Sequence, residues 1–291
     1  MKSPETKEEA LGLDYWRAQW ERRAEPKAIA KHTPQVWNKR SREWIAELAS
    51  EDGKPSMLAR VRQTTDFLLS RGALLPEYRA IDVGCGPGLF VAEFAKHIQT
   101  AAGLDFSDSF TEYGAKLARE RGLQNAEFYT ADFSALDIEK AGFSAAFDLV
   151  FTSITPAATG KGNLDKLIAM SRKHCYNAAF VHTEDELCSR AAREVFGTEY
   201  SPRFMGNGHN ALYNYLWHLG YYPETHYIDD VRELPVGEHT AAKLAGSLNL
   251  EDEAAIAEIK AWLEREKITS WRSEFKFGGL LWDVTARDSR N

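Results

Sequence analysis

One seven-residue segment constrains the fold of this chain more than any other: Asp82-Val83-Gly84-Cys85-Gly86-Pro87-Gly88. It follows a short apolar run at residues 80–83 and precedes residues 89–97, whose apolar side chains have helical spacing. Glycines between a buried strand and a helix carry no Cβ, so a ligand can lie directly against the backbone. The sequence therefore predicts a ligand-binding turn at the end of a strand.

The spacing of these glycines argues against two common ligands. A dinucleotide-binding turn has the pattern G-x-G-x-x-G, but Leu89 stands where its third glycine would fall. A nucleoside triphosphate loop needs Lys and then Ser or Thr after its last glycine, and neither follows Gly88. A nicotinamide oxidoreductase is therefore disfavoured.

Strand-like and helix-like segments alternate after this turn. Further short strands are expected at 101–105, 126–130, 147–152, 178–182, 225–228 and 275–284, and the helical segments between the first of them at 89–97, 109–121 and 164–173. Such alternation predicts a parallel sheet with helices on both faces. We expect an α/β, Rossmann-like, doubly wound and mostly parallel seven-stranded sheet.

Helical segments flank this sheet in the sequence. Trp16 and Trp20 lie four residues apart, as on one helical face, and a second such face begins at Trp37. We expect an N-terminal helical cap over residues 1–55 and one α/β domain over residues 56–291. Within that domain, residues 183–270 are expected to include a helical insertion before the last strand, a candidate lid.

The composition of the chain restricts the kinds of molecule that it is expected to bind. The chain has 36 basic and 43 acidic residues, a net charge of −7, which disfavours binding to a phosphate backbone. Its three cysteines match neither a disulfide framework nor a zinc site, so no metal is expected. No apolar stretch approaches a membrane span, and the N-terminus lacks an apolar leader. We expect a cytoplasmic monomer or homodimer without membrane or nucleic-acid partners.

Four motifs in order resemble those of class I S-adenosylmethionine-dependent methyltransferases. The glycine turn with its leading acid is similar to the family's D-x-G-x-G-x-G motif, and Gly103-Leu104-Asp105-Phe106-Ser107 ends the second strand with an acid. Ala131-Asp132-Phe133 follows the third strand, and residues 147–153 match the fourth. The resemblance implies S-adenosylmethionine as cofactor and S-adenosylhomocysteine as product.

The resemblance also implies roles for individual residues. Asp105 would hold the ribose, since a carboxylate can accept two hydrogen bonds from a vicinal diol. Asp132 would bind the adenine amine, while Phe106 and Phe133 would cover the purine faces. The motif positions expected at the cofactor are Asp82, Gly84, Cys85, Gly86, Gly88, Asp105, Phe106, Ser107, Asp132, Phe133 and Thr152.

A further segment, Trp37-Asn38-Lys39-Arg40-Ser41, is similar to the W-[DN]-x-R-[AS] pattern that precedes the glycine motif in some small methyltransferases. In those proteins the helix folds over the cofactor. The resemblance thus implies that Trp37 and Arg40 close over it here.

Methyl transfer needs positioning above all, with a general base only when the acceptor holds its proton tightly. Candidate catalytic residues lie at the end of the fifth strand or on a later aromatic helix: His182, Glu184, His209 and Tyr213. Each also has an ordinary interpretation as a packing residue. The fourth strand ends in Thr152-Ser153-Ile154-Thr155-Pro156 rather than [ND]-P-P-[YF], which argues against adenine or glutamine nitrogens as acceptors.

These observations predict a methyltransferase that acts on a small molecule. Two alternatives stay open: an RNA or protein methyltransferase, and a non-catalytic protein that binds S-adenosylmethionine or S-adenosylhomocysteine. The sequence leaves the acceptor molecule and its acceptor atom undetermined.

Overall fold

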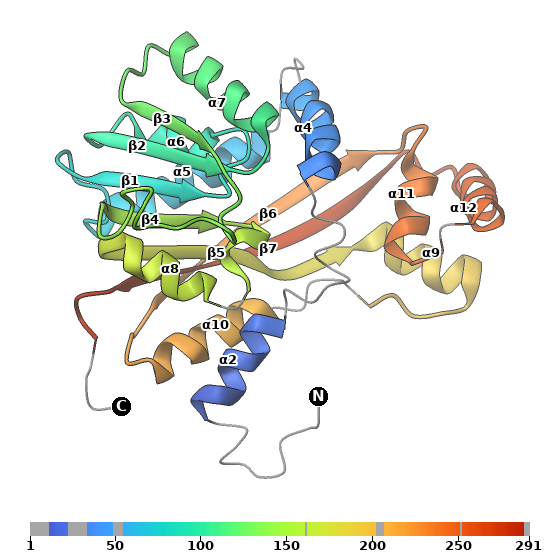
Figure 1. The fold of residues 1–291 in the computed structure, drawn as a ribbon. Helices are drawn as coiled ribbons and strands as arrows, with labels where there is room; N and C mark the ends of the chain where they lie inside the picture. Colours follow the sequence, from blue (N-terminus) through green and yellow to red (C-terminus); the bar gives the residue numbers. More distant parts are fainter. Residues whose placement is uncertain are drawn as a thin grey trace. The chain divides into compact units, whose positions relative to one another are not determined.

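Figure 1 shows a computed structural model of the chain, which describes residues 12–22, 34–48, 55–160, 162–201, 207–250 and 252–287. The strands in these ranges are β1 (Arg79–Val83), β2 (Thr100–Asp105), β3 (Ala126–Thr130), β4 (Phe147–Ser153), β5 (Ser171–Asp185), β6 (Glu224–Pro235) and β7 (Ser270–Asp283). The helices are α2 (Leu13–Glu21), α4 (Pro34–Leu48), α5 (Pro55–Ser70), α6 (Leu89–Phe94), α7 (Asp108–Glu120), α8 (Asn163–Met170), α9 (Glu186–Phe196), α10 (Asn207–His218), α11 (Thr240–Ser247) and α12 (Glu253–Arg265), with a 3-10 turn η2 (Pro156–Ala158).

The strands form one sheet in the order β3-β2-β1-β4-β5-β7-β6. The pairs β3–β2, β2–β1, β1–β4 and β4–β5 are parallel. The predicted seven-stranded α/β fold is confirmed. The winding reverses between β1 and β4, because β2 lies on one side of β1 and β4 on the other. Open α/β sheets bind ligands beyond the carboxyl ends of the strands at such a reversal.

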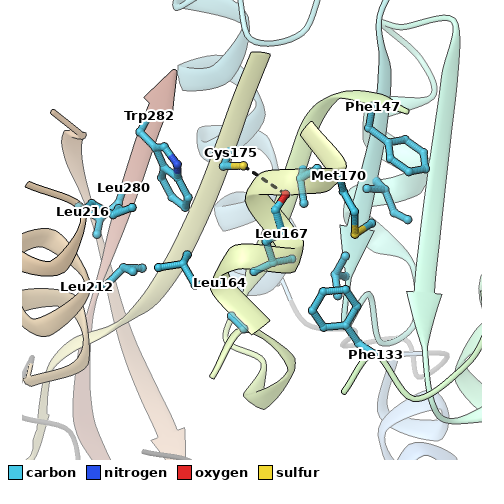
Figure 2. Packing of buried hydrophobic residues seen from close by; sticks show 14 of the residues in the cluster. Phe133, Phe147, Leu164, Leu167, Met170, Cys175, Leu212, Leu216, Leu280 and Trp282 are labelled. Carbon is cyan, nitrogen blue, oxygen red and sulfur yellow. Dashed lines mark hydrogen bonds between the residues drawn. The ribbon is translucent and has the colours of Figure 1, made fainter. Parts of the chain in front are cut away.

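Apolar side chains alternate between the two faces of the sheet, as the pleat requires. Ile81 and Val83 of β1 join one core cluster with residues of α8 and α10, while Ala80 joins another with residues of α5 and α6. Leu280 and Leu281 of β7 divide in the same way. Figure 2 shows the first cluster, in which the Cys175 thiol donates to the Leu167 carbonyl at 3.7 Å. Helices therefore cover both faces.

The start of β5 differs from prediction. A helix was expected to run to residue 173 and the strand to begin at 178, but α8 ends at Met170 and β5 begins at Ser171. Arg172 and Lys173 favour a helix locally. In the sheet they find partners across the chain: Arg172 pairs with Asp148 at 2.7 Å, and the Lys173 ammonium donates to the Tyr78 hydroxyl at 2.6 Å. Tertiary contacts thus override the local preference.

The described residues form two compact units, and the boundary falls within β5, β6 and β7. The first unit consists of the described residues within Met1–Ala179, Gly208–His226 and Gly278–Asn291. The second unit consists of the described residues within Phe180–Asn207 and Tyr227–Phe277. Three helices, α9, α11 and α12, build the core of the second unit; its buried residues are Leu187, Cys188, Ala191, Ala241, Leu244, Ala245, Ile259, Trp262 and Leu263. The expected boundary between an N-terminal cap and the α/β domain at residue 55 stays a prediction, as does the expected lid within residues 183–270.

Among the described helices, none combines the length and apolar character needed to cross a bilayer.

Candidate cofactor site

The glycine turn follows β1 and is attached to β2. The amides of Gly84 and Cys85 both donate to the Leu104 carbonyl, at 2.7 and 3.1 Å. The turn then enters α6, with Gly88 as the residue that precedes the helix. All three glycines have positive φ, with values of 78°, 51° and 74° for Gly84, Gly86 and Gly88. L-residues with a side chain adopt this conformation at a cost, so the turn requires glycine.

The three glycines differ in what surrounds them. A Cβ on Gly84 would lie 2.1 Å from Oγ1 of Thr155, and one on Gly88 would lie 2.6 Å from the Phe128 ring. A Cβ on Gly86 would meet nothing within 4 Å. Gly84 and Gly88 therefore allow close packing of protein on protein, while Gly86 exposes its backbone to open space. This is the geometry that a ligand lying against the turn requires.

The Asp105 carboxylate lies beside this open position. Its Oδ2 accepts from the Gly86 amide and its Oδ1 from the Ser107 amide, each at 2.9 Å. Burial raises the pKa of Asp105, and the hydrogen bonds from the Ser107 and Gly86 amides oppose that shift. A carboxylate has about four acceptor positions. The two oxygens of Asp105 can therefore still accept hydrogen bonds from a pair of ligand hydroxyls.

Asp82, the acidic residue of β1, is 2% exposed. Its Oδ1 finds no hydrogen-bond partner among the described residues. Burial first, and then the charge of Asp105, raise the pKa of Asp82 well above its usual range, while Arg60 opposes them. Two neighbouring acids and an unpartnered carboxylate oxygen suit a ligand that carries positive charge and hydroxyl groups. These two carboxyl groups thus fit S-adenosylmethionine, whose sulfonium and ammonium groups are cationic.

The turn after β3 holds Asp132 and Phe133. The Asp132 side chain is exposed and accepts from the amide and hydroxyl of Ser134, at 2.9 and 2.7 Å. Phe133 is 4% exposed and belongs to the core cluster of Figure 2, together with Met170. The Phe133 ring thus packs in the hydrophobic core in this structure. Contact of either residue with adenine stays a prediction.

Lys166 on α8 holds that turn, and sequence reasoning missed it. Its ammonium donates to the carbonyls of Phe133, Ser134 and Leu136, at 3.1, 2.8 and 3.1 Å. The three N–H donors of the ammonium thus match three carbonyls of one turn. The sequence shows only a lysine on a helix thirty-odd residues away, which carries no signal of this contact.

Cys85 lies within the glycine turn and Thr152 lies on the neighbouring strand β4, and both are buried. The Thr152 hydroxyl donates to the Tyr176 carbonyl at 3.1 Å and accepts from the Asn177 amide at 2.8 Å, so its bonds are satisfied within the sheet. Cys85 is 7% exposed, and burial raises the pKa of its thiol well above the usual range. Phe106 is half-buried at the end of β2.

Helix α4 carries the Trp37–Arg40 motif, and it contacts the segment that follows β2. The Ser107 hydroxyl donates to Oδ1 of Asn38 at 2.6 Å, and the Trp44 and Phe110 rings meet edge to face at 6.4 Å. Trp37 is half-buried, and the side chain of Arg40 lies outside the described part of the chain. The motif therefore contacts the segment after β2 through Asn38, a residue whose role the sequence did not predict.

The four candidate catalytic residues fall into two pairs. His182 and Glu184 lie in the second unit, with side chains 53% and 67% exposed and 3.8 Å between Nε2 and Oε2. His209 and Tyr213 lie one turn apart on α10 in the first unit. His209 is 7% exposed, and burial lowers its pKa, while the backbone of Gly278 opposes this shift. Tyr213 stacks on Trp217 at 6.1 Å.

Comparisons with known proteins identify a methyltransferase domain in this chain. Residues 80–177 match the family model described as a methyltransferase domain. The 23S rRNA (uracil(1939)-C(5))-methyltransferase RlmD of Alkalilimnicola ehrlichii is 29% identical over 111 residues, 38% of this chain and 24% of that protein. The chain thus spans about a quarter of the length of this curated relative.

Solved structures resemble the fold. Magnesium protoporphyrin IX methyltransferase of Synechocystis, determined with bound S-adenosylhomocysteine, has a TM-score of 0.51 and 13% identity, and covers 87% of this chain and 99% of its own. The YcgJ protein of Bacillus subtilis has a TM-score of 0.43 and 15% identity, covering 73% and 96%. The matched residues contain the glycine turn, Asp105 and the β4 strand. Residues 80–177 therefore match a methyltransferase domain, and the sheet that contains them has the fold of a solved methyltransferase.

Proposed function

We propose that this chain transfers the methyl group of S-adenosylmethionine to a small-molecule acceptor. The observation that carries the proposal is the open backbone at Gly86 with the Asp105 carboxylate beside it, at the point where the winding of the sheet reverses. The net charge of −7 supports a small acceptor over RNA, because an acidic chain repels a phosphate backbone.

The bound cofactor would supply an electrophilic methyl group on a sulfonium. The residues of this chain would provide position and environment. Asp105 would accept hydrogen bonds from the ribose hydroxyls, and the turn at Gly86 would let the methionine part lie against the backbone. The positive charge of that part would favour the ionised form of Asp82 against the burial that raises its pKa, and the carboxylate would then offset this charge. Such positioning in a site that excludes water can supply much of a transfer rate without covalent catalysis.

A general base is needed only if the acceptor keeps its proton at neutral pH. His209 is the buried candidate, and its lowered pKa keeps the imidazole neutral and able to accept a proton. The catalytic roles expected for Tyr213, His182 and Glu184 stay predictions.

Calorimetric titration with S-adenosylhomocysteine tests the cofactor site. Asp105→Ala should weaken binding at least about tenfold, equivalent to about 1.4 kcal/mol. Asp108→Ala, three residues along and exposed, is the matched control and should bind like the parent protein. Because Asp105 also accepts two backbone amides, the melting temperature of each variant is measured in parallel. Unchanged affinity in a folded Asp105→Ala protein would remove the ribose assignment.

The acceptor class needs a separate test. The protein is incubated with methyl-labelled S-adenosylmethionine and, in turn, a metabolite extract, total RNA and a protein extract. We expect label in the metabolite fraction. Label in RNA or protein would replace the small-molecule assignment, and tight cofactor binding without transfer to any fraction would favour a non-catalytic binding protein.

A further inference from the structure

The Ser107 side chain does something unusual for its position. Ser107 is the N-cap residue of α7, where a serine hydroxyl ordinarily accepts a hydrogen bond from an amide of the first turn. Here it makes no such bond, and instead donates to Oδ1 of Asn38 on α4 at 2.6 Å. Ser107 is fully buried, so water does not replace this partner. The hydroxyl therefore ties the start of α7 to α4.

Asn38 is equally unusual in its own helix. Asparagine favours caps and turns over helix interiors, yet Asn38 is the fifth residue of α4. Its carbonyl accepts from the Ser41 hydroxyl at 3.0 Å, and Ser41 is fully buried. Trp44, one turn further, meets Phe110 of α7. One face of α4 thus rests on the first turn of α7, with Asn38 as its polar contact.

This contact continues into the cofactor site through hydrogen bonds. The backbone amide of Ser107 donates to Oδ1 of Asp105, and Oδ2 of the same carboxylate accepts from Gly86. Asn38, Ser107, Asp105 and Gly86 therefore form one chain of contacts from α4 to the open backbone of the glycine turn. A carboxylate held at both oxygens has one orientation, and that orientation decides where ligand hydroxyls can bind.

We propose that Asn38 is a positioning residue for the cofactor, which holds the Asp105 carboxylate in its binding orientation through Ser107 and thereby couples the docking of α4 to cofactor binding. The proposal rests on the proposed function, because it takes Asp105 as the residue that binds the ribose. It assigns to Asn38 a role through Asp105, without contact with the reacting atoms. By linkage, cofactor binding stabilises the docked α4 as much as docked α4 strengthens binding.

The experiment measures affinity for S-adenosylhomocysteine by calorimetry. Asn38→Ala and Ser107→Ala should each weaken binding by roughly tenfold, the size expected for one lost hydrogen bond near a charged group. The double variant should be little weaker than either single variant, because both remove the same contact. Arg42→Ala, at an exposed position of α4, is the matched control and should bind like the parent.

A merely structural role for Asn38 would be revealed in the Asp105→Ala background. If Asn38 acts through Asp105, adding Asn38→Ala there should cause no further loss of affinity. Asn38→Asp keeps an acceptor oxygen for Ser107 and should recover most of the loss. Hydrogen exchange should show that S-adenosylhomocysteine protects the amides of residues 37–48 in the parent and not in Asn38→Ala.

The outcomes separate two failures. If the parent protein does not bind S-adenosylhomocysteine, or Asp105→Ala binds as well as the parent, the proposed function fails. If Asp105→Ala weakens binding while folded Asn38→Ala and Ser107→Ala do not, or if the effects of Asn38 and Asp105 multiply independently, the positioning role is wrong and the cofactor site stands.

Discussion

At the scale of single residues, the glycine turn shows how identical residues serve different needs. Gly84 and Gly88 make room for Thr155 and Phe128, whereas Gly86 faces open space. The pattern G-x-G-x-G indicates that the turn binds something, but it does not distinguish these roles. They depend on side chains that lie far away in the sequence.

Substitution of Gly86 tests the open position. Gly86→Ala places a Cβ in free space at positive φ, so we expect a loss of stability of about 1–2 kcal/mol and a loss of S-adenosylhomocysteine affinity of at least about tenfold. Gly122→Ala is the matched control, because Gly122 also has positive φ and nothing near its Cβ position. It should cost similar stability and leave affinity unchanged. Thermal unfolding and calorimetry give the two quantities.

Equal binding by the Gly86 and Gly122 variants would show that no ligand approaches the turn. Gly84→Ala should behave differently from both, because its Cβ would overlap the Thr155 side chain. We expect it to lower the melting temperature by more than either.

At the scale of elements, side chains of two helices form hydrogen bonds with the segments that follow strands of the sheet. Helix α8 carries Lys166, whose ammonium satisfies three carbonyls of the turn after β3. Helix α4 similarly holds the start of α7 through Asn38. Loops that carry function need such support, because their own short-range contacts do not fix one conformation.

Lys166→Met keeps the length of the side chain and removes its donors. We expect a loss of about 1–3 kcal/mol in stability, since three carbonyls lose a charged partner, together with weaker binding of S-adenosylhomocysteine. Lys140→Met, which removes an exposed lysine paired with Asp137, is the matched control and should change both by little. Chemical denaturation and calorimetry make the comparison. A destabilised variant with full affinity would show that the turn after β3 lies outside the cofactor site.

At the scale of the whole molecule, a half-buried histidine, His226, makes stability depend on pH. His226 of β6 stacks on Phe67 of α5, with ring centroids 4.0 Å apart, and meets Tyr176 of β5. Burial lowers the pKa of His226 to about 4, against 6.5 for an unperturbed imidazole. Between these values the unfolded chain binds a proton that the folded chain does not. The free energy of unfolding therefore falls as the pH drops from about 6.5 towards 4.

His226→Phe should reduce this acid sensitivity, because phenylalanine preserves the stacking and removes the proton-binding site. Paired carboxylates such as Glu224, whose pKa is lowered by its hydrogen bond with Arg71, also lose stabilising interactions in acid. The slope should therefore decrease without vanishing. Melting temperatures between pH 7 and pH 4 measure it, with the exposed His182 changed to Phe as control. An unaltered slope in His226→Phe would show that His226 is protonated in the folded protein.

The sequence by itself determined the order of strands and helices, the α/β class and the position of the glycine turn. Apolar periodicity and turn-forming glycines are local features, so they can be recognised in the sequence without knowledge of tertiary contacts. It also placed Asp82, Asp105 and Asp132 at or just after strand ends, where a parallel sheet presents its ligands.

Only the tertiary structure decided which atoms serve the site. It directed the Ser107 hydroxyl to Asn38 rather than to its own helix, brought Lys166 to the turn after β3 and placed Phe133 in the core. It also began β5 at Ser171, where local preference favours a helix. Each outcome depends on a partner dozens of residues away, and the free energy of such a contact exceeds the small local preferences that a sequence pattern can express.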